Sequence, residues 1–298
     1  MSEPSEGLFR HIGLRSATGL VVASMIGAGI FTTTGFQAAD LGHPGYIFLL
    51  WVVGGVLAFC GALCFAELGA AMPHAGAEYV YIRETYGSTI AFMSAFVALF
   101  AGFSAPIAAA LKSLMAYMGY FVPLFAENPL LFAGLHVNDA VAITLVWGLV
   151  AIHCGGVKGG IGFNDAITAF KVGGIVLIIA AAFIVGRGSL SNLTEVAPQF
   201  YSMSSPDRMS AFATSLIFVS FCYLGWNGSA YMAAEMKDPQ RVLPRSLLIG
   251  TVVVTVLYFL LNLMYFYGAG VSGRPWADCS GRTHARGNAW ARSPARTR

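Results

Sequence analysis

Charged residues are scarce in this chain of 298 amino acids, since only 10% are Asp, Glu, Lys or Arg while 57% are hydrophobic. Soluble domains carry about 25% charged and about 45–50% apolar residues. A soluble protein of this length would need far more charged residues to cover its surface than this chain has. The apolar content also excludes a disordered chain. The net charge of +3 is small and scattered, which excludes a nucleic-acid binder. The composition predicts an integral membrane protein embedded in a lipid bilayer.

Motifs for metal binding and catalysis are also missing. The five cysteines form no CxxC pair, and four of them lie inside apolar runs, as buried thiols do. The sequence contains no HExxH, no GxSxG and no pair of carboxylates within an apolar stretch. We therefore expect no enzyme activity, no metal and no cofactor. The polar N-terminus is not a cleavable signal peptide.

Seven stretches are long and apolar enough to cross a bilayer core of about 30 Å, which takes about 20 helical residues. They are residues 16–37, 45–72, 88–122, 138–154, 164–186, 209–235 and 246–268. The third is long for one span and too short for two spans with a loop. We predict one tilted helix there, bent near Pro106.

The basic residues of the short loops favour a cytoplasmic N-terminus, in the cell membrane. With this orientation the outer loops before residue 270 hold only Arg187 and Arg208. The cytoplasmic segments hold seven basic residues, which are Arg10, Arg15, Arg83, Lys158, Lys237, Arg241 and Arg245. A seven-helix receptor would have its N-terminus outside, so the charge distribution argues against that class.

Two of the seven stretches carry residues that weaken a helix near the middle of the span. The first has Gly27 and Gly29, and the sixth has Gly225, Asn227 and Gly228. Glycine weakens a helix by about 1 kcal/mol relative to alanine and lets another group approach the backbone. For one span alone, close helix–helix packing explains such residues equally well. Two interrupted spans, in matching positions of the two halves of a chain, are typical of inverted-repeat transporters with a binding site at mid-membrane.

The chemistry expected at such breaks suits a zwitterion. A half-helix that begins near Gly29 presents free N–H groups and a positive dipole end, which suit a carboxylate. A half-helix that ends near Phe221 presents free, unpaired carbonyl groups and a negative end, which suit an ammonium group. No charged side chain stands at either break. The pattern predicts an α-amino acid as the ligand, bound by main-chain groups.

Three separated motifs resemble one family. The segments GLVVASMIGAGIF, FAELGAAMPHAGAEYVYIRETYG and FCYLGWNGSAYMAAEMKDPQRVLPRSL are similar to amino acid transporters of the amino acid–polyamine–organocation superfamily, in particular its L-type and related bacterial permeases. The resemblance runs from Leu14 to Gly268. It implies an all-α integral membrane fold of the LeuT type, an inverted 5+5 repeat with discontinuous helices one and six.

The resemblance also implies domain limits. Residues 1–15 are the cytoplasmic N-terminus, 16–186 a first repeat with helices one to five, and 187–268 the start of a second repeat with helices six and seven. Residues 269–298 hold six of the 17 basic residues and one acid, and they are expected to be disordered. Either they are a functional basic tail, or the chain has left its ancestral reading frame or been cut short, which we favour. The second repeat is then incomplete, and we expect the chain not to transport alone.

The resemblance further implies the substrate-binding residues. Gly27, Ala28, Gly29 and Ile30 match the unwound segment whose N–H groups hold the carboxylate. The carbonyls of Met25, Ile26, Phe221 and Leu224 match those that receive the amino group. The break in helix six matches Phe221, Cys222, Tyr223, Leu224 and Gly225, with the Phe221 ring as a gate.

Two departures from the family concern specificity. Ala28 stands where many relatives have serine, so one hydroxyl contact to the carboxylate is absent. Leu224 stands where L-type members have glycine, which narrows the side-chain pocket and argues against bulky aromatic substrates.

Lys171 is an ionisable residue inside the fifth apolar stretch. Such residues are expensive in a membrane and are functional candidates, although a lysine can also reach the interface with its long side chain. Proton-coupled relatives carry a lysine at this point, where sodium-coupled relatives bind sodium. The resemblance therefore implies that Lys171 couples transport to protons or replaces the sodium requirement.

These features predict secondary active transport of amino acids across the cytoplasmic membrane, coupled to protons or to exchange. The alternative is a transporter of polyamines or another small organic amine. A cation without a carboxylate would need an acidic side chain in the pocket, and no Asp or Glu lies near either break. The sequence names no protein partner and no particular amino acid.

Overall fold

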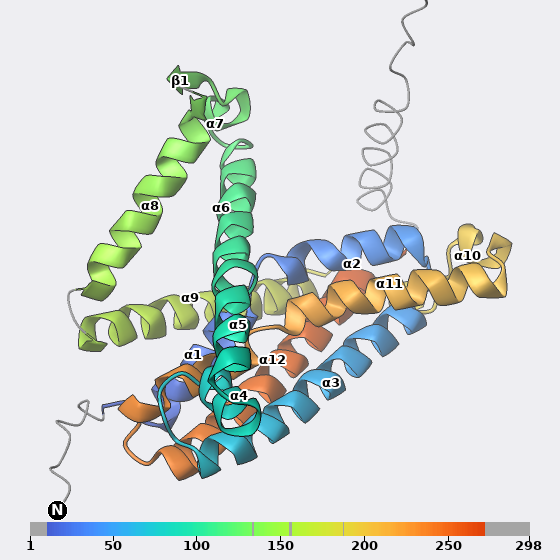
Figure 1. Cartoon of the computed structure of the whole chain (residues 1–298). Coiled ribbons are helices and arrows are strands. Elements are labelled where there is room, and N and C mark those ends of the chain that lie inside the picture. Colours follow the sequence, from blue (N-terminus) through green and yellow to red (C-terminus); the bar gives the residue numbers. More distant parts are fainter. Residues whose placement is uncertain (1–10, 133, 155–156, 187, 272–298) are drawn as a thin grey trace, which may run out of the picture. The chain divides into compact units, whose positions relative to one another are not determined.

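A computed structural model describes residues 11–271 except 133, 155, 156 and 187 (Figure 1). Six helices in this part of the chain are long and apolar enough to cross a membrane, and a seventh span follows if the bent pair α1 and α2 is counted as one. The prediction of seven spans is confirmed with that pair included. The predicted tail lies almost entirely outside the described residues.

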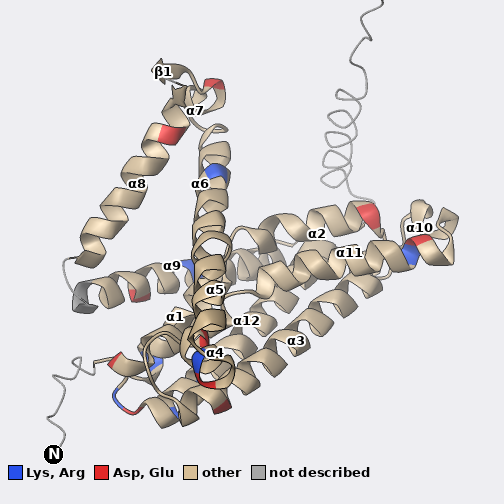
Figure 2. Ribbon diagram, viewed as in Figure 1, with Lys and Arg blue, Asp and Glu red and all other residues tan. Residues whose placement is uncertain are grey.

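The spans follow the chain in the predicted order, with limits that differ by a few residues. They are α1 (Leu14–Met25) with α2 (Gly29–Asp40), α3 (Pro44–Ala71), α5 (Ser88–Val97) with η1 (Ala98–Ser104) and α6 (Ala105–Met118), α8 (Val137–Cys154), α9 (Val157–Ile184), α11 (Ser205–Tyr223) with η3 (Trp226–Glu235), and α12 (Pro239–Ala269). In Figure 2 these helices are almost entirely free of charged residues, as the composition requires.

The shorter elements were not expected from the sequence. They are α4 (Glu78–Tyr86), α7 (Pro123–Glu127), β1 (Leu130–Phe132), β2 (Leu135–His136), η2 (Leu190–Leu193) and α10 (Pro198–Ser202). The strands β1 and β2 pair in antiparallel fashion. Each of these elements connects two spans, where length and hydropathy carry little information.

The third span is continuous from Ser88 to Met118, as predicted, but its irregularity is a π-helical segment, η1, that ends just before Pro106. Proline has no N–H and its ring clashes with the carbonyl four residues earlier, so an α-helical ladder cannot pass it unchanged. The wider turn gives Ala105 N–H a partner in Phe100 O, and the Ser104 hydroxyl donates to Leu99 O at 2.7 Å.

The last span begins earlier than predicted, which is a correction to the loop assignment of Arg241 and Arg245. Both residues lie in α12, which starts at Pro239. Proline is favoured in the first helical position because its missing N–H has no helical partner there. The N–H groups of Arg241 and Val242 bond to Asp238 O and close the first turn. In the sequence, the dipeptide Asp238-Pro239 is the signal that marks the start of this helix.

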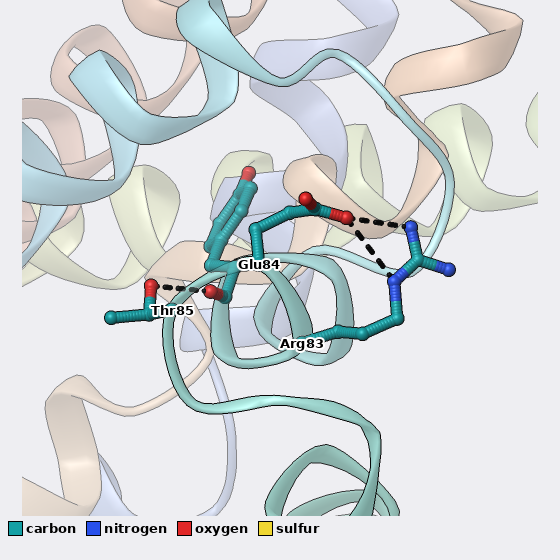
Figure 3. A network of polar contacts seen from close by, with 4 residues as sticks. Arg83, Glu84 and Thr85 are labelled. Carbon is teal, nitrogen blue, oxygen red and sulfur yellow. Dashed lines mark hydrogen bonds and ion pairs between the residues drawn. The ribbon is translucent and has the colours of Figure 1, made fainter.

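The helix α4 carries much of the charge that follows α3. Its Arg83 donates two hydrogen bonds to Glu84, at 3.3 and 2.9 Å, and the Thr85 hydroxyl donates to Tyr81 O (Figure 3). Both charged side chains are about half exposed, so this pair contributes little to stability.

The described residues form two compact units, which we treat one at a time. One comprises residues 11–23, 63–168 and 227–247. The other comprises residues 24–62, 169–226 and 248–271, and it contains every residue predicted to bind substrate. Its buried side chains include Trp51, Tyr223 and Tyr258, whose rings lie within 6 Å of one another.

In this second unit, His43 lies just before α3 and packs between aromatic rings. Its ring centroid is 5.0 Å from that of Tyr46 and 4.7 Å from that of Phe200, and the Arg208 guanidinium lies 4.5 Å over the same Phe200 ring. Burial lowers the pKa of the His43 imidazole below its ordinary value of 6.5, because desolvation disfavours the cation.

A histidine whose pKa is lower in the folded state stabilises the fold above its unfolded pKa, and this contribution is lost as the pH falls. We expect the thermal midpoint of the wild type to fall between about pH 7 and about pH 5 by more than that of His43→Phe, which keeps the ring packing. Thermal denaturation in detergent at both pH values measures the difference. An equal fall in both proteins would contradict this role of His43.

Candidate functional site

The first span is interrupted as predicted. The helix α1 ends at Met25, residues 26–28 are not α-helical, and α2 begins at Gly29. Met25, Ile26 and Ile30 are buried, Gly29 is half-buried, and Gly27 and Ala28 are exposed. No side chain caps the N-terminus of α2. Its first N–H groups and the positive end of its dipole therefore stand at the break.

The sixth span is interrupted in a different way. The helix α11 ends at Tyr223, Leu224 is extended with ψ 154°, and Gly225 has a φ of +98°. The chain then continues as the 3₁₀ helix η3. Cys222 and Tyr223 are buried, whereas the Phe221 and Leu224 side chains are 65% and 55% exposed. The positive φ explains why glycine is needed here, since other residues reach that conformation only with strain.

The two breaks lie against each other. A Cβ atom on Gly225 would be 2.6 Å from Ser24 O in the last turn of α1, and a Cβ atom on Gly29 would be 2.8 Å from Cys222 Sγ. Cys222 Sγ is also 3.3 Å from Thr33 Oγ1, one turn into α2. Both glycines thus allow a close approach and not only a bend, Gly225 to a main-chain oxygen and Gly29 to a side-chain sulfur. This proximity distinguishes a shared site from two unrelated helix contacts.

The Tyr258 hydroxyl connects the breaks. This tyrosine of α12 is fully buried, and its hydroxyl lies 2.7 Å from Met25 O and 3.1 Å from Cys222 O, so it donates its one proton to these two carbonyls in a shared or alternating way. Asn262 Nδ2 donates to Tyr258 O, and the Thr34 hydroxyl donates to Asn262 Oδ1. Nothing in the sequence distinguishes Tyr258, because a tyrosine in an apolar span usually serves packing.

Lys171 reaches the first break from α9. Its ammonium nitrogen donates to Ile26 O at 3.1 Å, and the side chain is half-buried. A lysine that reached the lipid interface would not make this contact. The structure therefore places the one ionisable residue singled out in the sequence on the unwound segment.

The carbonyls differ from the sequence expectation in one respect. We expected unpaired groups, but Met25 O accepts from Tyr258, Ile26 O from Lys171, and Phe221 O from Leu224 N–H at 3.3 Å. A carbonyl oxygen has two lone pairs, so each can accept a second hydrogen bond. The protein partners hold the carbonyls in place, and a cation that approaches them meets an oriented set of dipoles. Among the described residues, no group of three or more His, Cys, Asp or Glu could hold a metal ion.

Comparisons with known proteins identify the family of the chain. The family model described as amino acid permease matches residues 12–273. The "Large neutral amino acids transporter small subunit 2" of Mus musculus is 30% identical over 259 residues, which are 87% of this chain and 48% of that protein. The "b(0,+)-type amino acid transporter 1" of Rattus norvegicus is 30% identical over 269 residues, which are 89% and 53% of the two chains. The "Asc-type amino acid transporter 1" of Homo sapiens is 28% identical over 265 residues, 87% and 48% of the two chains.

The chain spans about half the length of the curated relatives it matches. Its match to the family model nevertheless covers most of the sequence, both interrupted spans included. The long apolar helices are those of an all-α, multi-pass membrane protein of the LeuT-like type. The chain belongs to the amino acid permease family.

Proposed function

We propose that this protein takes part in secondary active transport of amino acids across the cytoplasmic membrane, by alternating access. The observation that carries the proposal is the contact between the two breaks, which brings a helix N-terminus and a helix C-terminus together within one unit. The family relationship supports the same function, because the three relatives are amino acid transporters by name.

In the proposed binding mode, both charged ends of the amino acid meet main-chain groups. The carboxylate lies at the uncapped start of α2, on the N–H groups of the segment 27–30. The ammonium group binds the carbonyls of Met25, Ile26, Phe221 and Leu224, at their remaining lone pairs. The geometry of this set depends on Tyr258, which holds Met25 O and Cys222 O at a fixed separation.

Specificity for the side chain is proposed to come from α11 and its C-terminal cap. Leu224 is large and exposed at the break, and Phe221 is exposed one turn before it. Phe221 serves as the gate over the substrate. Leu224 occupies volume that a smaller residue would leave open, so we propose substrates with small side chains over aromatic ones.

Lys171 is proposed to couple transport to protons or to make sodium unnecessary. Its ammonium group lies on Ile26 O, next to the carbonyls proposed for the substrate. A change in the charge of this group would change the field at the amino group directly.

A polyamine or another small amine is the less favoured substrate. Such a cation lacks the carboxylate that the start of α2 would bind, and residues 16–37 and 209–234 contain no Asp or Glu to hold a second ammonium group. The proposed orientation keeps the N-terminus (residues 1–15) in the cytoplasm, residues 16–186 as a first repeat and 187–268 as the start of a second.

Binding of radiolabelled L-alanine to the purified chain in lipid nanodiscs tests the function. We expect saturable binding that L-serine displaces. Putrescine and L-alanine methyl ester lack the carboxylate, N-acetyl-L-alanine lacks the ammonium group, and L-tryptophan has a side chain too large for the pocket. Each of these four should displace L-alanine at least about tenfold less well than L-serine does. Displacement by putrescine or by the methyl ester as strong as that by L-serine would overturn the zwitterion site.

The variant Tyr258→Phe extends the same assay. Loss of one hydroxyl donor that joins the breaks costs about 1 kcal/mol, which corresponds to about fivefold weaker L-alanine binding. The matched control is Tyr117→Phe, because Tyr117 is an exposed tyrosine of α6.

A further inference from the structure

The chain just before α1 is joined by main-chain bonds to the chain just after η3. Ile12 N–H donates to Glu235 O at 3.0 Å, and Lys237 N–H donates to Ile12 O at 3.1 Å. Ile12 and Met236 thereby form a parallel β-bridge, and both side chains are fully buried. We call this pair of bonds the clamp. Since it uses only main-chain atoms and excludes water, it favours movement of the two segments as one body.

The first turn of α1 is held by a second contact of a different kind. The Ser16 hydroxyl donates to Asp165 Oδ2 in α9 at 2.8 Å, and both residues are half-buried. Gly19 lies one turn further along α1, where an added Cβ would be 3.2 Å from Asp165 Oδ1. Serine and glycine on one face of α1 therefore allow the carboxylate to sit close to that helix.

Asp165 is the only acidic residue in α9, and a carboxylate in an apolar span is a functional candidate. Its contact with Ser16 is a single side-chain hydrogen bond with partial access to solvent, in contrast to the two buried bonds of the clamp. Separation of α1 from α9 is therefore easier here than at the clamp.

We propose that Ser16 and Asp165 form a latch that holds the N-terminal half of α1 against α9 and opens during the transport cycle, while the clamp makes the end of η3 move together with α1. The inference rests on the proposed function in one respect, since alternating access supplies the reason for the movement. Ser16 and Asp165 are positioning residues, because neither contacts the substrate. The two-state element is the N-terminal half of α1, which is either latched or released.

Amide hydrogen exchange of the full chain in lipid nanodiscs tests the latch without a transport assay, since exchange reports local opening. We expect Ser16→Ala and Asp165→Ala each to raise the exchange rate of residues 14–23 at least tenfold, and that of residues 233–237 with it. The double variant should exchange no faster than either single variant. Asp165→Asn keeps an oxygen acceptor and should retain most of the protection.

The variant Ile12→Pro tests the clamp, because proline has no N–H to donate to Glu235 O. Combined with Ser16→Ala, it should leave fast exchange in residues 14–23 and restore slow exchange in residues 233–236, whereas Lys237 N–H, whose acceptor is Ile12 O, should stay fast. A matched control is Ser113→Ala in α6, whose hydroxyl bonds only to Ala109 O of its own helix. This control should exchange like the wild type.

The outcomes separate the latch from the proposed function. Unchanged exchange in Ser16→Ala and Asp165→Ala overturns the latch, even if the chain binds L-alanine. Faster exchange throughout the chain, α12 included, would show a general loss of stability and would also overturn it. Locally faster exchange in a chain that fails to bind L-alanine would support the latch and count against amino acid transport.

Discussion

Replacement of Gly225 by alanine is expected to have the largest effect of any single substitution at the site. A non-glycine residue held at positive φ costs about 1–3 kcal/mol, and Gly225 has a φ of +98°. The new Cβ would also lie 2.6 Å from Ser24 O, a main-chain atom that cannot turn away as a side chain can. We expect the variant to lose at least about 2 kcal/mol of stability and all detectable L-alanine binding. Thermal denaturation in detergent and the nanodisc binding assay measure the two effects.

The control for this prediction is Gly174→Ala in α9. Gly174 has no atom within 4 Å of an added Cβ and no positive φ. Alanine is the better helix former by up to about 1 kcal/mol, so this variant should be as stable as the wild type or slightly more so. A Gly225→Ala protein that denatures and binds like the wild type would show that the breaks are not in the close contact described.

Loss of the Lys171 ammonium group is expected to have the second largest effect. A hydrogen bond to a charged group contributes about 1.5–3 kcal/mol, and this one orients Ile26 O in the unwound segment. We expect Lys171→Met, which keeps the length of the side chain, to weaken L-alanine binding about tenfold to a hundredfold. We also expect L-alanine binding by the wild type to depend on pH, because Lys171 is proposed to exchange a proton, and we expect the variant to lose that dependence.

Lys112→Met is the matched control for Lys171→Met. Lys112 is an exposed lysine of α6, far along the chain from both breaks. Its substitution should change neither the affinity for L-alanine nor the pH profile. If Lys171→Met bound L-alanine with unchanged affinity and the same pH profile as the wild type, the proposed role of Lys171 would be abandoned.

The interruptions of the first and sixth spans could be predicted because they are local. Gly27 and Gly29, and Gly225 with Gly228, weaken a helix wherever it runs, and lipid leaves no water to replace the lost main-chain bonds. The limits of the spans were less predictable. Helix α12 begins at Pro239, well before the apolar run, because capping and not hydropathy sets a helix start.

The groups that complete the site were not predictable from the sequence. Tyr258 is separated from Met25 by 233 residues and from Cys222 by 36, and nothing in its surrounding residues distinguishes it from a packing aromatic. The same holds for Ser16 and Asp165, which lie 149 residues apart. A long-range hydrogen bond depends on the packing of several helices, and no sequence period records it.

The sequence by itself determined that this chain is a helical membrane protein with seven apolar spans, two of them interrupted by glycine, since hydropathy and helix propensity are properties of neighbouring residues. Only the tertiary structure decided that the two interruptions meet and that Tyr258 and Lys171 bond to their carbonyls. The physical reason is that main-chain groups freed at a break take partners from whichever helix packs against them, and that packing depends on the whole unit.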